Sequence, residues 1–228
     1  MSAKILAVDT TSEFGSLALV EGGTIVAETL IHSPEGFGHV LFDRLRQLLE
    51  QHQWRLRDID CYAALAGPGS FTGVRIGLAA VKGLAEANAK PAVAVSNLQT
   101  LAACGTRALR APLLDARRGE VYAALYDSGL RLLGKERVLK LPAWLESLPE
   151  GDIELISNHF APFRGALAGT RFERLPVVEA PRALAGMAGL IAARLYQQGQ
   201  ALDPAALDAN YVRRSDAELF WRDKDKDS

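Results

Sequence analysis

Three polar segments of the chain carry side chains whose types and spacing suit phosphate or metal chemistry. The first is Asp9-Thr10-Thr11-Ser12, which separates two apolar runs with the pattern of strands. A tight polar turn can present backbone amides and hydroxyls to a phosphate while its carboxylate holds a metal-bound water. The alternative is a hairpin turn in which the Asp and Thr side chains hydrogen-bond to nearby backbone. The turn contains no glycine, so the segment taken alone favours the hairpin turn.

The second segment, Gly67-Pro68-Gly69-Ser70-Phe71-Thr72-Gly73, joins a predicted buried strand to a predicted helix. In this setting the amides of a helix N-terminus can bind an anion. The segment is not a Walker loop, because no Gly-Lys-Ser/Thr follows at the required position. The glycines also suit a strand-to-helix turn that needs close packing, and both interpretations stay open.

The third segment runs from Asp115 to Glu120 and continues into an apolar run. Asp115 and Glu120 could form a pair of carboxylates, and Arg117 and Arg118, beside Gly119, could clamp a phosphate. The alternative is a charged hairpin turn. Two adjacent arginines would crowd a phosphate that backbone amides hold, which counts against the clamp.

Metal ligands and nucleophiles are not spaced for catalysis. The four histidines are His32, His39, His52 and His159. No two of them lie four residues apart, so the sequence contains no His-x-x-x-His site, and we predict no metal centre. The sequence also contains no Gly-x-Ser-x-Gly elbow and no Cys-x-x-Cys. Its two cysteines, Cys61 and Cys104, have the apolar surroundings of buried thiols in a reducing compartment.

The elements that must position these segments follow from hydrophobic periodicity. In the first half we expect strands at residues 5–8, 15–20, 24–31, 62–66 and 92–95, and helices at about 38–53, 70–88 and 96–107. The first three strands form an antiparallel meander. The first helix places Leu41, Phe42, Leu45, Leu48 and Leu49 on one apolar face. Ser96 to Gln99 fits a capping box for the third helix.

The pattern restarts near Pro112. Here we expect a strand ending at Asp115, strands at 120–127, about 130–141 and 153–156, and a helix at 181–197 that begins on proline. The openings at Asp9 and Asp115 predict two related lobes, residues 1–107 and the smaller 108–228. The last residues of the second lobe can pack back on the first, and we expect the charged tail at 222–228 to be disordered.

The helix expected at 70–88 contains three interior glycines, Gly73, Gly77 and Gly83. Each costs about 1 kcal/mol relative to alanine, so close contact with a neighbour must offset the loss. Gly73, Gly77 and Ala80 form a smooth stripe at helical spacing. A second apolar stripe, which can pack inward, consists of Phe71, Val74, Leu78 and Val81. The neighbour on the smooth stripe is either a helix of the same lobe or a partner.

The composition is that of a globular protein with no nucleic-acid-binding face of its own. Hydrophobic residues make up 49% of 228 residues, and 26 basic and 27 acidic residues leave a net charge of −1. The chain has no basic stripe, so autonomous tRNA or DNA binding is not expected. We see neither a leader peptide nor an apolar run long enough for a membrane span, and expect a cytoplasmic protein.

Four segments together resemble the TsaB family, bacterial partner proteins in tRNA threonylcarbamoyladenosine synthesis. They are Ile5 to Thr10, Gly67 to Gly77, Asp115 to Tyr122 and Asn210 to Arg214, and the likeness spans residues 4 to about 214. The resemblance implies the two-lobed actin-like ATPase fold, as in hexokinase and Hsp70. That α/β fold has a duplicated mixed sheet flanked by helices, which agrees with the repeated openings.

The resemblance also implies a non-catalytic role. In this family the catalytic relative, TsaD, carries metal-binding histidines and transfers the threonylcarbamoyl group to tRNA adenosine. The TsaB-like subunit has no catalytic residues or cofactor of its own and activates TsaD through helices of the first lobes. ATP, if any, is bound by the partner or at the complex interface. The chain alone is expected to form a homodimer on the same surface, and to meet a TsaE-like ATPase and tRNA only through the complex.

The resemblance implies two sets of residues. The partner interface consists of Leu41, Leu45, Ser70, Phe71, Gly73, Val74, Gly77, Ala80 and Val81. A degenerate nucleotide or phosphate region consists of Asp9, Thr10, Thr11, Gly67, Gly69, Asp115, Arg117, Arg118, Gly119 and Glu120. The turns at Asp9 and Arg117 lack the glycines of an active ATPase, so we expect weak or no nucleotide binding by the isolated chain.

Two other functions compete with this one. A small phosphotransferase of the acetate- or sugar-kinase kind has the same fold, but it requires a glycine-containing phosphate loop and a catalytic carboxylate beside the acceptor. A homodimeric scaffold with no role in tRNA modification is the third possibility. Loss of modified tRNA on depletion of the gene would argue against the scaffold.

Overall fold

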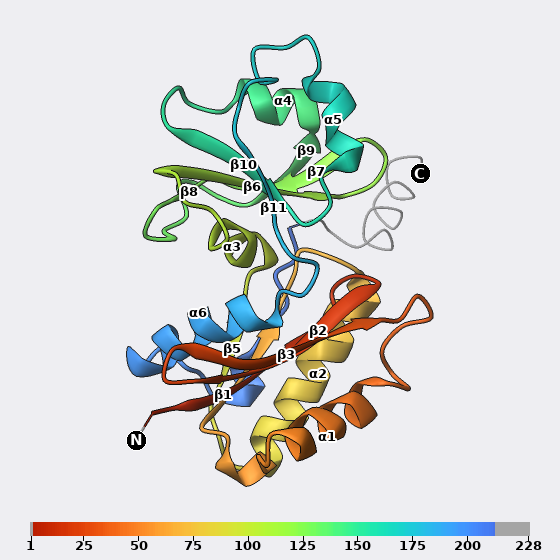
Figure 1. Ribbon diagram of the computed structural model, residues 1–228, viewed down its shortest axis with the longest axis vertical. Coiled ribbons are helices and arrows are strands. Elements are labelled where there is room, and N and C mark those ends of the chain that lie inside the picture. The colour runs from red at the N-terminus through yellow and green to blue at the C-terminus, as the bar shows by residue number, and fades with distance from the viewer. Residues whose placement is uncertain (1, 213–228) are drawn as a thin grey trace, which may run out of the picture.

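The computed structural model describes residues 2–212. They form two lobes, each built on one sheet, and the lobes follow one another along the long axis of the molecule (Figure 1). The first sheet has the order β3-β2-β1-β4-β5. Its strands are β1 (Lys4–Asp9), β2 (Phe14–Glu21), β3 (Thr24–His32), β4 (Cys61–Leu65) and β5 (Ala92–Val95). The first three are antiparallel, and β4 and β5 continue parallel to β1. The predicted meander is confirmed.

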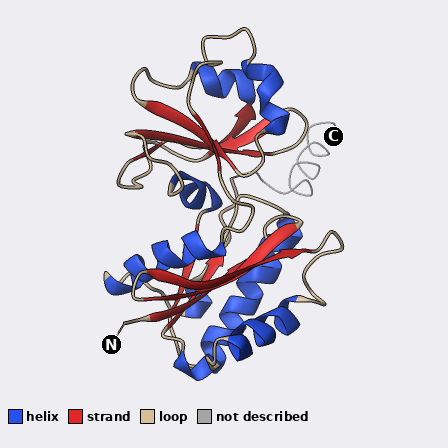
Figure 2. Cartoon of the chain, viewed as in Figure 1, coloured by secondary structure: helices blue, strands red, loops and turns tan. Residues whose placement is uncertain are grey.

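Helices cover both faces of this sheet (Figure 2). Alternate residues of a strand point to opposite faces, and β1, the central strand, is apolar on both. Leu6 and Val8 belong to the core under α1 (Leu41–Gln51) and α2 (Phe71–Ala87). Ile5 and Ala7 belong to the core under α6 (Ala185–Gln197). The short helices η1 (Leu56–Asp58) and η2 (Pro204–Ala206) lie in connections.

The second sheet has the order β11-β10-β6-β7-β9, with β8 paired to β6. Its strands are β6 (Leu109–Asp115), β7 (Glu120–Ala123), β8 (Tyr126–Asp127), β9 (Arg137–Lys140), β10 (Ile153–Ser157) and β11 (Val177–Glu179). From β9 to β11 this order and these strand directions repeat those of the first sheet from β3 to β5. Helices α4 (Leu141–Glu146) and α5 (Ala161–Leu167) cover its outer face, so the predicted duplication is confirmed.

The two lobes exchange their last helices. Helix α3 (Asn97–Ala102) follows the first sheet but packs against β6 and β10 of the second. Helix α6 follows the second sheet but packs against β1, β2 and β4 of the first. The hydroxyl of Ser16 on β2 accepts hydrogen bonds from the amides of Leu184 and Ala185 at the start of α6. Residues 108–228 were expected to form the second lobe. Helix α6 lies in this range but completes the first lobe.

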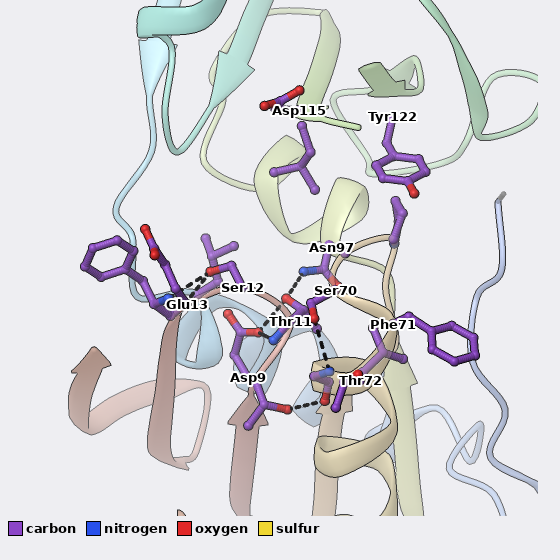
Figure 3. Close-up of a pocket in the computed structure, with 18 of the residues that line it drawn as sticks. Asp9, Thr11, Ser12, Glu13, Ser70, Phe71, Thr72, Asn97, Asp115 and Tyr122 are labelled. Carbon is purple, nitrogen blue, oxygen red and sulfur yellow. Dashed lines mark hydrogen bonds between the residues drawn. The ribbon is translucent and has the colours of Figure 1, made fainter. Parts of the chain in front are cut away.

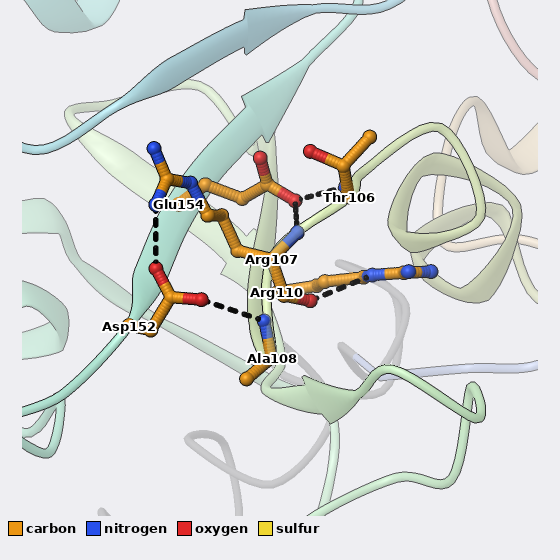
Figure 4. A network of polar contacts seen from close by, with 6 residues as sticks. All are labelled: Thr106, Arg107, Ala108, Arg110, Asp152 and Glu154. Carbon is orange, nitrogen blue, oxygen red and sulfur yellow. Dashed lines mark hydrogen bonds and ion pairs between the residues drawn. The ribbon is translucent and has the colours of Figure 1, made fainter.

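Several predicted boundaries are wrong for identifiable reasons. The helix expected at 96–107 ends at Ala102, because the buried carboxylate of Glu154 accepts hydrogen bonds from the amides of Thr106 and Arg107 (Figure 4). Asp152 forms an ion pair with Arg107 at 2.8 Å in the same network. The helix expected from Pro181 begins at Ala185, because residues 181–184 cross from the second sheet to the first.

Other differences concern the second lobe and the ends of the chain. The strand expected at 120–127 is split into β7 and β8, and the strand expected at 130–141 is reduced to β9. The tail at 222–228 and the pair Arg213-Arg214 lie outside the described residues. Within residues 2–212, no helix combines the length and apolar character needed to cross a membrane.

Candidate functional site

A cavity of about 1290 Å³ lies between the two lobes and brings the three polar segments together (Figure 3). The first lobe contributes the β1–β2 turn and the turn that leads into α2. The second lobe contributes the β6–β7 turn and residues 157–159 at the end of β10. The C-terminal segment closes one side through Asn210, Tyr211 and Val212. The cavity therefore lies where the openings of the two lobes, at Asp9 and Asp115, face each other.

Asp9 lies at the carboxyl end of β1 and is 2% exposed. One of its carboxylate oxygens accepts hydrogen bonds from the amide of Thr11 at 2.9 Å and from its hydroxyl at 2.7 Å. Burial raises the pKa of Asp9 to about 6, although the two hydrogen bonds from Thr11 act to lower it. The carboxylate thus stabilises its own turn by local hydrogen bonds, as the hairpin interpretation predicts.

The turn before α2 packs directly on the β1–β2 turn. Ser70 donates its amide to the carbonyl of Thr11 at 2.7 Å, and its hydroxyl accepts from the amide of Gly73 as the cap of α2. A Cβ on Gly69 would lie 2.6 Å from the carbonyl oxygen of Thr11. Glycine is required here because the two backbones touch, which supports the packing interpretation of this segment.

The β6–β7 turn repeats the β1–β2 turn. The carboxylate of Asp115 accepts from the amide of Arg117 at 2.7 Å, as Asp9 accepts from Thr11. Asp115 and Arg117 line the cavity, whereas Arg118, Gly119 and Glu120 do not. Lys140 instead donates to the carbonyl of Arg118 at 2.6 Å on the outside of the turn. Of the two alternatives for this segment, the geometry of the turn agrees with the charged hairpin turn, and only Asp115 and Arg117 of its four charged side chains line the cavity.

Of the ten predicted phosphate-region residues, six line the cavity: Asp9, Thr10, Thr11, Gly69, Asp115 and Arg117. Gly67 lies behind it, where its amide donates to the side-chain carbonyl of Asn97 at 2.9 Å. Sequence reasoning missed Asn97, whose amide nitrogen donates to the hydroxyl of Thr11 and so joins both turns. Asn97 is the first residue of α3, and its sequence context indicates only a helix cap. Partners 30 and 86 residues away leave no local signal.

The predicted partner interface needs correction, because most of its residues are covered by their own chain. Four apolar members are buried in the core of the first lobe: Leu41, Leu45, Val74 and Val81. Gly73 and Gly77 face the β1–β2 turn: a Cβ would lie 2.0 Å from the carbonyl oxygen of Thr10 and 2.5 Å from its hydroxyl, respectively. Ala80 is also buried, at 8% exposure. The smooth stripe is therefore an internal contact of the lobe.

The opposite side of α2 is open. Phe71, Arg75, Ala79 and Gly83 follow one another at intervals of four residues and are all exposed. We call these four residues the outer row of α2. Phe71, expected to pack inward, is 44% exposed, and a Cβ on Gly83 would have no atom within 4 Å. Phe42, expected on the buried face of α1, is 56% exposed.

The C-terminal segment packs on the start of this row. Arg75 lies 3.7 Å over the ring of Phe71 and donates to the hydroxyl of Tyr211 at 3.1 Å. The rings of Phe71 and Tyr211 are 5.8 Å apart. Cation–π and aromatic contacts of this kind contribute about 1 kcal/mol each at an exposed site. Asn210 to Val212, part of the predicted C-terminal element, thus lie beside both the cavity and the outer row.

Comparisons with known proteins identify the family. The family model for "TsaD: tRNA N6-adenosine threonylcarbamoyltransferase" matches residues 38–161. The tRNA threonylcarbamoyladenosine biosynthesis protein TsaB of Bacillus subtilis is 31% identical over 233 residues, covering 97% of this chain and 99% of the relative.

Solved structures agree with the fold. An uncharacterized protein with similarity to the peptidase YeaZ from Pseudomonas aeruginosa superposes with a TM-score of 0.77 at 27% identity, covering 92% of this chain and all of that one. The activator of 2-hydroxyisocaproyl-CoA dehydratase from Clostridium difficile, with bound ADPNP, has a TM-score of 0.56 at 12% identity, covering 88% and 97%. This second likeness concerns the fold alone, and the actin-like ATPase fold class is confirmed. Given the full-length likeness to the Bacillus protein, the chain belongs to the TsaB family.

Proposed function

We propose that the chain is a non-catalytic subunit that binds and activates a TsaD-like transferase in tRNA threonylcarbamoyladenosine synthesis. The outer row of α2 carries the proposal from the structure, because it is an exposed helix face on a chain whose relatives are named for this pathway. It replaces the stripe of Gly73 and Gly77 as the contact with the partner.

The chemistry of the outer row suits a helix of another protein. Ala79 and Gly83 let a second helix approach closely, since neither has a side chain beyond Cβ. Phe71 provides exposed aromatic area at one end, and Phe42 provides more on α1, which covers the same face of the sheet as α2. Aromatic and arginine side chains commonly supply most of the binding energy of an interface. Arg75, stacked on Phe71, adds a cation at this end.

The absence of chemistry in this chain is supported by how its polar groups are used. One carboxylate oxygen of Asp9 accepts from Thr11, the hydroxyl of Thr11 accepts from Asn97, and the hydroxyl of Ser70 caps α2. The sequence also has no pair of histidines spaced for a metal. In this account ATP, if any, belongs to the partner or to the interface, and the isolated chain binds nucleotide weakly or not at all.

The remaining features of the proposal come from the family. The chain forms a homodimer when alone, reaches a TsaE-like ATPase and tRNA only through the complex, and works in the cytoplasm. The phosphotransferase alternative is not favoured, because the curated relatives are named as biosynthesis proteins of the tRNA modification.

Reconstitution tests the function. The chain would be combined with the TsaD-like and remaining pathway proteins of its organism, and modified adenosine in tRNA measured by mass spectrometry. We expect no product without the chain, and near-normal product with Asp115→Ala, a cavity variant. Loss of product with Asp115→Ala as complete as omission of the chain, in a variant that folds, would place chemistry in the cavity and overturn the non-catalytic role. ATP turnover by the chain alone would do the same.

A further inference from the structure

One carboxylate, that of Glu136, joins three segments that lie far apart in sequence. One of its oxygens accepts hydrogen bonds from the hydroxyl of Ser96 and from the hydroxyl of Tyr126, the latter at 2.8 Å. The other accepts from the side-chain amide of Asn210 at 2.6 Å. Glu136 lies just before β9, in the second lobe, and is half-buried.

The three donors belong to different parts of the fold. Ser96 is the first residue after the first sheet, and its hydroxyl also caps α3. Tyr126 is on β8 of the second sheet and is 2% exposed. Asn210 belongs to the C-terminal segment, and its backbone amide donates to the carbonyl of Ala66 at 2.8 Å in the first lobe. Glu136 thus ties the second lobe to the connection between the sheets and to the C-terminal segment.

The arrangement of donors favours a carboxylate at this position. The side-chain nitrogen of Asn210 can only donate, and the hydroxyl of Ser96 already accepts from the amides of Leu98 and Gln99, so it faces Glu136 as a donor. An ionised carboxylate accepts through both oxygens. A glutamine would retain one accepting oxygen but would turn an N–H₂ group toward one of the donors. Hydrogen bonds to an ionised group are stronger than neutral ones, so the arrangement favours Glu136 over its amide.

The residue after Asn210 is Tyr211, which contacts both Phe71 and Arg75 on the outer row of α2. We propose that Glu136 is a positioning residue: through Asn210 it holds Tyr211 against the outer row, and so couples the arrangement of the two lobes to partner binding. The coupling to the partner rests on the proposed function, whereas the anchoring of the C-terminal segment does not.

The anchoring is tested in the isolated chain by hydrogen exchange. In Glu136→Gln the backbone amide of Asn210 is expected to exchange about tenfold faster. This is the scale of one lost hydrogen bond to a charged group. Glu136→Gln combined with Asn210→Asp reverses the donor and acceptor, and is expected to restore slow exchange. Glu150→Gln is the matched control, because Glu150 is an exposed carboxylate of the same lobe. Unchanged exchange in folded Glu136→Gln would overturn the proposal.

The coupling is tested by affinity for the TsaD-like protein. Binding by Glu136→Gln is expected to be about tenfold weaker, with recovery in the reversed pair and no change in Glu150→Gln. Native affinity in Glu136→Gln would refute the coupling, as would equal weakening in the reversed pair. If the unmodified chain does not bind the TsaD-like protein at all, the proposed function fails, and the exchange experiment still decides whether Glu136 anchors the C-terminal segment.

Discussion

Asp9, which the resemblance places in a degenerate phosphate region, stabilises its own turn. Asp9 is 2% exposed, and one of its carboxylate oxygens accepts hydrogen bonds from both the amide and the hydroxyl of Thr11. The pKa of Asp9 rises from its ordinary 3.8 to about 6 because burial disfavours the charge more than Thr11 favours it. Since the folded state holds the proton more tightly, Asp9 lowers the free energy of unfolding as pH rises from about 4 to about 6.

Asp9→Asn is therefore expected to raise stability above about pH 6 and to have little effect below about pH 4. The asparagine oxygen can still accept from Thr11, and the cost of a buried charge disappears. The shift corresponds to at most about 3 kcal/mol at neutral pH. Urea unfolding of both proteins at about pH 4 and pH 7.5 measures the difference. A variant that is equally destabilised at both pH values would contradict this explanation of Asp9.

Sequence reasoning located much of the site at this scale but not its connections. Asp9, Thr11 and Asp115 were identified from their places between strands, and Ser96 as a helix cap. Asn97 and Glu136 could not be identified, because all their partners except Tyr126 are 30 to 86 residues away. Such contacts depend on tertiary packing, which no local pattern encodes.

At the scale of elements, α2 separates what periodicity predicts from what it cannot. The helix was expected at 70–88 and is observed at Phe71–Ala87. Its orientation was predicted only in part: Val74, Leu78 and Val81 are buried as expected, whereas Phe71 is exposed. Contact with Thr10 explains the side that sequence reasoning misassigned: Gly73 faces the carbonyl of Thr10, Gly77 faces its hydroxyl, and Phe71 is left outside. Similarly, α3 ends where Glu154 captures two amides, a contact that its own sequence does not contain.

Replacement of two glycines of α2 by alanine should have opposite effects on the stability of the protein. In Gly73→Ala the new Cβ would lie 2.0 Å from the carbonyl oxygen of Thr10, so the turn or the helix must move. A destabilisation of about 2 kcal/mol or more is expected, as for other overpacked sites. Gly83 has open space around it, and Gly83→Ala should stabilise by about 0.5–1 kcal/mol through helix propensity. Thermal unfolding compares the two variants. Equal effects of the two substitutions on stability would contradict the orientation of α2 in which Gly73 faces Thr10 and Gly83 faces outward.

The whole molecule is two copies of one topology that are locked together by exchanged helices. The repeated openings at Asp9 and Asp115 made the duplication predictable, and both sheets have the same strand order. The exchange was only partly predictable: a return of the chain to the first lobe was expected, but not that α3 packs on the second sheet. Each lobe packs against a helix of the other, and the C-terminal segment links the cavity between them to the outer row.

The central claim is that the outer row of α2 binds a TsaD-like protein. Analytical ultracentrifugation of the chain with the TsaD-like protein of its organism tests it, using Gly83→Trp and the matched control Gly165→Trp. Both glycines lie in helices, with open space where a Cβ would stand. We predict a heterodimer for the native chain and for Gly165→Trp, and an affinity lower by about a hundredfold or more for Gly83→Trp. Native affinity in Gly83→Trp, or no association of the native chain in the presence of ATP and the other pathway proteins, would contradict the account.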